Sequence, residues 1–173
     1  RICPLHGPIL DHDLDTYLSL YNTWSSYEAE TKGVAIAYAS VYGHTKVAAE
    51  KLAELLSAKG TSVELHDLTR GDEAEAIEDA FRYTTLVCAS VTYNGSMFPA
   101  MRNFLADLVE KKYQNRTVAF IQNGSWAPAA TKAMKSTLEG CKNITFCEQE
   151  VSVAGALTPE TEKELELLAN ALA

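Results

Sequence analysis

A group of hydroxyl-bearing and small residues follows a short apolar run near position 40. It reads Ser-Val-Tyr-Gly-His-Thr and comprises Ser40, Val41, Tyr42, Gly43, His44 and Thr45. Three of its side chains carry hydroxyl groups, and its glycine lets a ligand approach the backbone closely. Hydroxyl and main-chain N–H groups donate hydrogen bonds to anionic oxygens. These residue types favour the binding of a phosphate monoester without a fixed cation.

The residues on either side predict the elements that would position this turn. The apolar run 34–38 has no polar alternation, which predicts a strand covered on both faces. After Thr45, apolar residues recur on one face of a predicted helix. Unpaired N–H groups and the positive end of a helix dipole attract anions. The turn lacks the lysine of a Walker A loop and the three glycines of a dinucleotide fingerprint. An ordinary strand-to-helix turn with a capping hydroxyl is the alternative.

The remaining strand patterns predict the order of a sheet. Residues 63–65 alternate between apolar and polar types, as in a half-exposed edge strand. The runs 86–89 and 118–121 are continuously apolar, as in central strands. A fifth run, 144–147, alternates again. This pattern predicts a doubly wound α/β fold with a five-stranded parallel sheet in the order 2-1-3-4-5 and helices on both faces. It disfavours the dinucleotide-binding order 3-2-1-4-5-6.

Two further loops should meet the first at the carboxyl ends of the strands. Ligands of doubly wound sheets bind where the strand order reverses, here between the first and third strands. The second loop comprises Ser90, Val91, Thr92, Tyr93, Asn94 and Gly95, and the third comprises Asn123, Gly124, Ser125 and Trp126. We expect the aromatic rings of Tyr93 and Trp126 to flank a planar ligand ring.

These three loops resemble those of a known family. Ser-x-Tyr-Gly-x-Thr after a first strand resembles the FMN phosphate loop of flavodoxin-like domains. Tyr42 in third place, together with Ser-x-Thr-Tyr-Asn-Gly in the second loop, resembles the flavodiiron (A-type flavoprotein) branch. The third loop departs from that branch after Gly124-Ser125, because Trp126-Ala127-Pro128 replaces the usual Tyr/His-Gly-Trp. The resemblance implies that FMN is the cofactor.

The first 30 residues resemble an inter-domain junction of the same branch. His6-Gly7-Pro8-Ile9 is followed by a predicted helix rich in Tyr and Trp, and no methionine precedes Met97. The resemblance implies that residues 1–30 are the tail of a missing metallo-β-lactamase-like domain and residues 31–173 a flavodoxin-like FMN-binding domain. His6 would be a di-iron ligand only in the full-length parent. The cluster 11–13 is expected to be a solvated helix cap, because adjacent side chains point in different directions.

The resemblance also implies a function. In flavodiiron proteins this domain receives electrons from rubredoxin or a flavin reductase and passes them to a di-iron centre that reduces oxygen or nitric oxide. The parent would be a head-to-tail homodimer and an oxidoreductase, whereas the fragment alone would only transfer electrons. A free-standing flavodoxin, an FMN-dependent quinone reductase and a flavin-free interaction module are the alternatives. A signalling receiver domain is disfavoured, because it needs acidic residues where this chain has Ser40 and Ser90.

Composition narrows the classes of partner. The chain has 173 residues, 47% of them hydrophobic, which is enough for one substantial core. Its formal net charge of −8 argues against nucleic acid and anionic membranes as partners. No apolar run reaches about 18 residues, so a soluble, cytoplasmic protein is expected. The four cysteines form no Cys-x-x-Cys pair and are expected to be free thiols.

Overall fold

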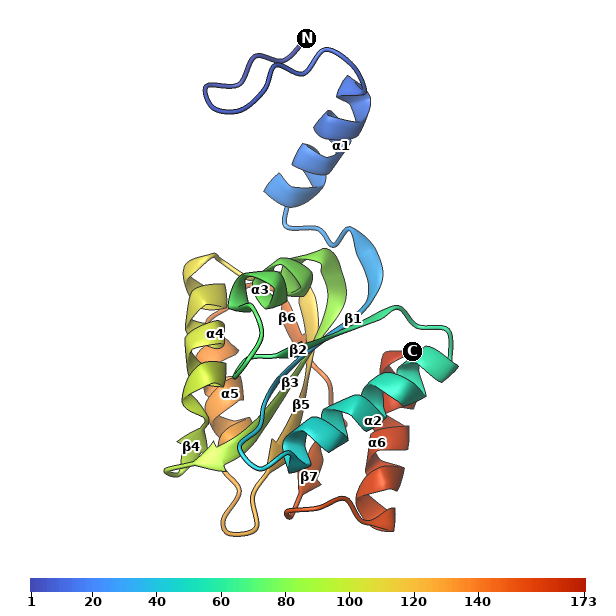
Figure 1. Ribbon diagram of the computed structural model, residues 1–173, viewed down its shortest axis with the longest axis vertical. Helices are drawn as coiled ribbons and strands as arrows, with labels where there is room; N and C mark the ends of the chain where they lie inside the picture. Colours follow the sequence, from blue (N-terminus) through green and yellow to red (C-terminus); the bar gives the residue numbers. More distant parts are fainter.

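The computed structural model describes residues 1–173 and consists of an α/β body with an N-terminal arm (Figure 1). The strands are β1 (Thr31–Ala39), β2 (Val63–Asp67), β3 (Tyr83–Tyr93), β4 (Ser96–Met97), β5 (Arg116–Asn123), β6 (Ile144–Phe146) and β7 (Val151–Val153). The helices are α1 (Leu14–Ser25), α2 (His44–Ala58), α3 (Glu73–Arg82), α4 (Pro99–Glu110), α5 (Ala130–Leu138) and α6 (Pro159–Leu172). No helix is both long and apolar enough to cross a membrane.

The strand order confirms the prediction for the five main strands. The sheet runs β2-β1-β3-β5-β6, in which β5 and β6 are the predicted fourth and fifth strands. Two further short strands, β4 and β7, pair with β3 and β5 and bring the sheet to seven strands. β4 folds back on β3 through a two-residue turn at Asn94 and Gly95, both with positive φ, as hairpin turns of this length require. β7 pairs with β5 beyond the end of β6.

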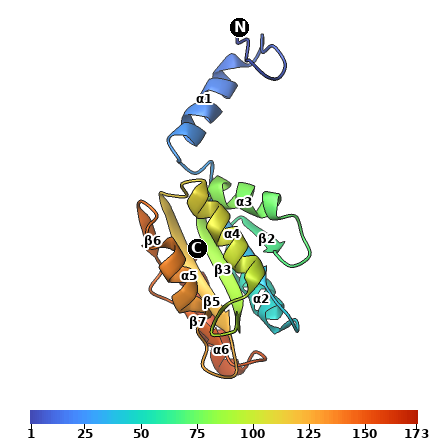
Figure 2. The same cartoon turned by 90° about the vertical axis from the view of Figure 1, so that its left-hand side faces the viewer.

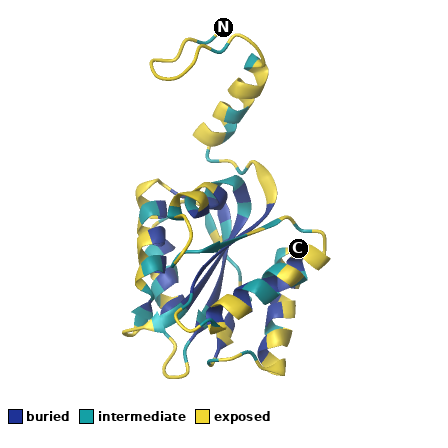
Figure 3. Ribbon diagram, in the orientation of Figure 1, coloured by how far each residue is buried: buried dark blue, intermediate teal, exposed yellow.

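Helices cover both faces of the sheet, as predicted. α2 and α6 lie on one face and α3, α4 and α5 on the other (Figures 1 and 2). Each face has its own hydrophobic core, formed with Leu52 and Leu165 on the first side and with Phe104 and Met134 on the second. The central strands are therefore buried on both faces (Figure 3), and β1 is fully buried from Gly33 to Ala39. This burial fixes the position at which the chain leaves β1.

The N-terminal arm stands apart from both cores. α1 extends from the end of the sheet at which the parallel strands begin, and none of its residues is buried (Figures 1 and 3). The large apolar residues Tyr17, Leu18 and Tyr21 are exposed, and Trp24 near the end of the helix is 55% exposed. The segment 11–13 is also exposed. Asp13 occupies the N-cap position, but its side chain makes no capping hydrogen bond, so that part of the expectation is wrong.

A buried arginine ties the arm to the sheet. Arg116 is 3% exposed, and its Nη1 donates to the carbonyl oxygen of Tyr27 at 2.7 Å. Its Nη2 donates to the carbonyl of Phe81, and the neighbouring Asn115 amide donates to the carbonyl of Ser26 at 3.3 Å. No carboxylate pairs with Arg116, and burial lowers the pKa of its guanidinium. Carbonyl groups from the linker and from the end of α3 thus replace water around this charge.

Substitution of Arg116 should test this anchor. Arg116→Met keeps most of the side-chain volume but removes the donor to the Phe81 carbonyl and leaves the Tyr27 carbonyl with only the Asn115 amide at 3.4 Å. We expect the free energy of unfolding to fall by about 2 kcal/mol, because buried acceptors would lose hydrogen bonds from a charged group. Urea unfolding measures this change, and Arg102→Met, at an exposed position of α4, is the control. Equal stability of the two variants would contradict the assignment.

The start of β1 contains a glycine that the packing requires. A Cβ at Gly33 would lie 2.7 Å from the carbonyl oxygen of Ser62 and 2.7 Å from the Tyr83 ring. Gly33→Ala should therefore destabilise the protein by about 2 kcal/mol through overpacking. Gly140→Ala is the matched control, because no atom lies within 4 Å of its added Cβ. Thermal unfolding of both variants checks the prediction, and similar midpoints would show that β1 shifts freely at this point.

Candidate functional site

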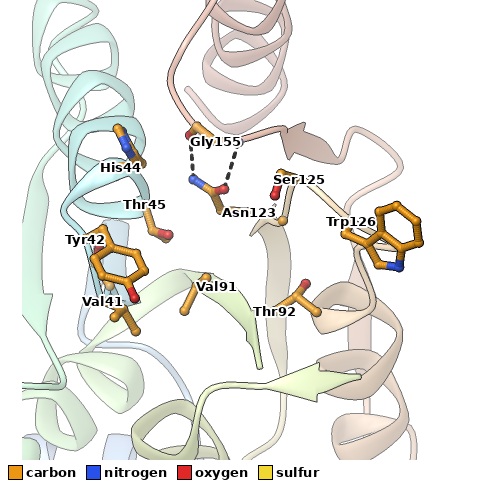
Figure 4. A pocket seen from close by; sticks show the side chains of 12 residues that line it. Val41, Tyr42, His44, Thr45, Val91, Thr92, Asn123, Ser125, Trp126 and Gly155 are labelled. Carbon is orange, nitrogen blue, oxygen red and sulfur yellow. Dashed lines mark hydrogen bonds between the residues drawn. The ribbon is translucent and has the colours of Figure 1, made fainter. Parts of the chain in front are cut away.

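A cleft of about 360 Å³ lies at the carboxyl ends of the strands, at the point where the strand order reverses. Its volume lies within the range of small-molecule sites. The predicted loops contribute most of its walls (Figure 4). The residues that line it are Ser40, Val41, Tyr42, His44, Thr45, Val91, Thr92, Asn123, Gly124, Ser125, Trp126 and Gly155.

The first loop ends at the exposed N-terminus of α2. The Gly43 N–H donates to Ser40 Oγ at 3.1 Å, and Gly43 has a φ of 91° at the N-cap position. A left-handed backbone at this point favours glycine. The first helical hydrogen bond runs from the Val47 N–H to the Gly43 carbonyl, so the N–H groups of residues 44–46 have no helical partner. Thr45 is 2% exposed and its side chain lies at the cleft wall (Figure 4).

Only two of the six predicted residues of the second loop line the cleft. Val91 and Thr92 line the cleft, and the Thr92 hydroxyl accepts a hydrogen bond from the Ala129 N–H at 3.1 Å. Ser90 is fully buried outside the lining, because its hydroxyl donates to the Val91 carbonyl and accepts from the Phe98 N–H. Its side chain therefore stabilises the hairpin of β3 and β4.

The end of that hairpin also lies outside the cleft lining. The Tyr93 ring packs edge-on against Phe98, with ring centroids 5.5 Å apart. Asn94 and Gly95 form the turn itself, and neither lines the cleft. The Tyr93 ring thus packs against the residue that precedes α4, and its expected flanking role stays a prediction.

The third loop is held in place by Asn123. Its side-chain amide donates to the carbonyl of Gly155 at 2.9 Å and accepts from the N–H of Gly155 at 3.1 Å (Figure 4). Both polar atoms of Asn123 are used in this pair, so this residue fixes the loop between β7 and α6. The sequence analysis missed Gly155, which lines the cleft with a φ of 91°. A glycine after the apolar-polar-apolar run 151–153 was the available signal.

The neighbouring Gly124 is constrained by packing. A Cβ at this position would lie 3.1 Å from Thr92 Oγ1 and 3.4 Å from Pro128 Cα. The Gly124 N–H also donates to the Val153 carbonyl at 2.9 Å. These contacts hold the second and third loops close together, so the cleft floor is formed before any ligand enters.

Two aromatic side chains border the cleft on opposite sides. Tyr42 lies beside the first loop and Trp126 at the outer rim of the third (Figure 4). They are 89% and 87% exposed, respectively. Large aromatic surfaces of this kind gain free energy by stacking on a planar ligand. Tyr42, unlike Tyr93, is thus an aromatic residue of the cleft lining.

The cleft is almost free of ionisable groups. No Lys, Arg, Asp or Glu lines it, and its titratable side chains are Tyr42 and His44. Just before the first loop, burial and then the Asp67 carboxylate raise the pKa of Tyr38 to about 12. Tyr38 is therefore neutral at physiological pH. A ligand in this cleft meets hydroxyls, main-chain N–H groups and apolar surfaces rather than fixed charges.

The predicted metal ligand lies far from the cleft. His6 is exposed in a loop of the N-terminal arm, which a bridge between Ile2 and Leu10 closes. The arm lies at one end of the molecule, and the start of α2 and the carboxyl end of β5, which line the cleft, lie at the other (Figure 1). No three His, Cys, Asp or Glu side chains are close enough together to hold a metal ion. A role of His6 in a longer protein stays a prediction.

This chain is similar both to parts of proteins that are longer than itself and to the whole of a shorter protein. An uncharacterised protein of Methanocaldococcus jannaschii is 29% identical over 147 residues, which cover 84% of this chain and 36% of that protein. The chain thus spans about a third of that relative. A flavodiiron protein from Giardia intestinalis has a TM-score of 0.80 at 20% identity, over 94% of this chain and 40% of that one.

A flavodoxin from the domain Archaea has a TM-score of 0.71 at 18% identity, over 83% of this chain and 96% of that one. Both structural likenesses are below 25% identity and establish the fold. The flavodoxin domain model, in contrast, matches residues 35–158, which include the three loops and the cleft. The chain therefore belongs to the flavodoxin domain family.

Proposed function

We propose that this chain is an FMN-binding electron-transfer domain whose cleft holds the cofactor. The observation that carries the proposal is the position of the first loop, where unpaired N–H groups of α2 and the hydroxyls of Ser40 and Thr45 meet at the cleft wall. Such an arrangement binds the phosphate of a nucleotide-like ligand. Family membership supports FMN as that ligand.

The residues present fit the phosphate end of FMN. Gly43 leaves the approach to the helix terminus open, because no atom lies within 4 Å of a Cβ built there. No carboxylate lines the cleft, so an anion meets no repulsion from its walls. The side chains of Ser40 and Thr45 would donate to the phosphate oxygens. The helix dipole would contribute further, since anions are stabilised within the first turn of a helix.

The other end of the cleft fits a flat aromatic ring. Tyr42 and Trp126 would cover the flavin from its two sides, and Thr92 and Gly124 would form the floor beneath it. When bound, FMN supplies the redox chemistry, and the protein supplies binding, orientation and electrostatics. The apolar side chains of the lining, such as Val41 and Val91, would exclude water from the flavin ring. One edge of the flavin would stay open to a redox partner.

We further propose that the chain is part of a flavodiiron oxidoreductase. The Giardia flavodiiron protein covers 94% of the chain, whereas the archaeal flavodoxin covers 83%. In this proposal the first 30 residues are the junction to a metallo-β-lactamase-like domain. His6, within that junction, would be a ligand of the di-iron site of the full-length protein. Rubredoxin or a flavin reductase would be the electron donor to a cytoplasmic, head-to-tail homodimer that reduces oxygen or nitric oxide. This chain alone would transfer electrons without reducing either gas.

A free-standing flavodoxin is the second candidate. The observation that favours it is that the body of this chain matches 96% of the archaeal flavodoxin, with no further domain needed for the fold. Both candidates share the FMN site, and they differ in the role of the exposed α1 arm.

Loss of one hydroxyl should weaken the phosphate interaction specifically. Thr45→Val keeps the shape of the side chain and removes its donor. We expect the Kd for FMN to rise about tenfold, because hydrogen bonds to charged groups contribute about 1.5–3 kcal/mol. Fluorescence titration measures the Kd, and Thr145→Val, at an exposed position of β6, is the control. Riboflavin affinity should not change, and an equal loss for both flavins would contradict the phosphate role of Thr45.

Removal of the outer aromatic ring should affect the flavin ring instead. Trp126→Ala should raise the Kd for FMN and for riboflavin by about fivefold each, because a stacked aromatic pair contributes about 0.5–1.5 kcal/mol beyond its buried area. Trp126→Phe, which keeps an aromatic face, should recover much of the affinity. The same titration checks this prediction. Unchanged affinity of Trp126→Ala would show that the ring binds elsewhere.

A further inference from the structure

A second cavity, of about 520 Å³, lies beside α5 and shares no lining residue with the cleft. This α5 groove is lined by one side of the helix, between Thr131 and Glu139, by Gln122 of β5 and by Glu150 before β7. Apart from Pro128, every lining residue has a hydroxyl, amide, ammonium or carboxylate group. Its volume lies within the range of small-molecule sites. Such a lining favours a ligand with many polar atoms over a flat aromatic one.

The Thr131 hydroxyl, in the lining of this groove, has no hydrogen-bond partner. Thr131 is 5% exposed, and its Oγ1 is buried without a donor or acceptor nearby. The Thr131 N–H donates to Gln122 Oε1 at 3.1 Å, so this residue is held against the end of β5. A buried polar group without a partner costs free energy, and few such groups persist in folded proteins. A ligand oxygen in the groove would supply the missing acceptor.

The first turn of α5 lies at the same end of the groove. Its N-cap residue, Ala129, makes no side-chain capping bond, and the N–H groups of Ala130 and Lys132 have no acceptor. The Lys132 side chain is exposed, lines the groove and forms no ion pair. Free N–H groups, the helix dipole and this ammonium group all favour an anion here. Together with the Thr131 hydroxyl, they form the anion end of the groove.

The other end of the groove carries carboxylates. Glu139 directly follows α5, about 10 Å along the helix from Lys132 at a rise of about 1.5 Å per residue. The Glu150 carboxylate pairs with Lys135, whose Nζ also lies 5.8 Å from the centroid of the Phe120 ring. This pair neutralises both of its members, so Lys132 and Glu139 are the uncompensated charges of the lining. Carboxylates accept hydrogen bonds from hydroxyl groups. The groove thus offers donors at one end and an acceptor at the other.

We propose that the α5 groove is a second ligand site, which binds a small polyhydroxylated phosphate of the sugar phosphate class. The phosphate lies at the N-terminus of α5, where the Lys132 ammonium and the free N–H groups bind it. One phosphate oxygen accepts a hydrogen bond from the Thr131 hydroxyl. The sugar hydroxyls extend along the helix and donate to the Glu139 carboxylate. This site does not depend on FMN, because the two cavities have no residue in common.

The test uses three probes, which are glucose 6-phosphate, glucose and inorganic phosphate. Each is titrated into the protein with and without FMN, and NMR follows the amide signals of residues 131–136. Glucose 6-phosphate should shift these signals and bind at least about tenfold more tightly than either other probe, because it occupies both ends of the groove at once. Signals of residues 43–46 report on the cleft separately. Failure of FMN to bind would contradict the proposed function and leave the shifts at 131–136 unchanged.

Variants assign the contacts. Lys132→Gln should weaken glucose 6-phosphate about fivefold, as expected for an exposed ion pair. Thr131→Val should weaken it by a similar factor and yet raise the melting temperature without ligand, because the unpaired hydroxyl is gone. Glu139→Gln should weaken glucose 6-phosphate but not inorganic phosphate. Lys163→Gln, at an exposed position of α6, is the matched control.

Three results would overturn the inference. The first is the absence of shifts at residues 131–136 with glucose 6-phosphate. The second is equal affinity for glucose 6-phosphate and inorganic phosphate, which would rule out the sugar contacts. The third is unchanged affinity of Lys132→Gln and Thr131→Val, which would place the ligand elsewhere.

Discussion

The burial of β1 on both faces is the constraint on which the rest of the structure depends. Two separate cores cover this strand, so it cannot slide without moving Ala and Val side chains out of both. The chain therefore leaves β1 at a fixed point, and the left-handed Gly43 turns it directly into α2. The start of that helix consequently lies at the cleft, where His44 and Thr45 form part of the lining. Packing in the core thus determines the geometry of the proposed phosphate site.

The cleft at the end of β1 is nearly uncharged, and hydrogen bonds hold its walls together. Its walls are tied to one another by the Asn123–Gly155 pair and by the Thr92 hydroxyl bound to the Ala129 N–H. These bonds join the third loop to the loop before α6 and the second loop to the start of α5. The N-terminal arm is organised differently, since Arg116 holds its linker while α1 itself has no partner.

Sequence patterns predicted the main strands because buried and edge strands differ in their apolar periodicity. The run 34–38 is continuously apolar, whereas 63–65 alternates between apolar and polar residues. This difference between central and edge strands was enough to predict the order of the five main strands. The short strand β7 was not predicted, although its residues 151–153 alternate between apolar and polar types as those of β6 do. The orientation of Tyr93 could not be predicted from its position in a loop, since it depends on the hairpin formed by Asn94 and Gly95. The role of Arg116 depends on three segments that are distant in sequence, and only the tertiary structure brings them together.

The central claim is that the phosphate of FMN lies at the N-terminus of α2. Amide chemical shifts, recorded by NMR during titration with FMN and with riboflavin, test it most directly. If the phosphate lies there, the backbone N–H groups of Gly43, His44, Thr45 and Lys46 should shift strongly with FMN and only slightly with riboflavin. Both flavins should shift residues near Thr92 and Trp126 alike. Equal shifts at residues 43–46 for the two flavins, or shifts confined to another part of the chain, would contradict the account.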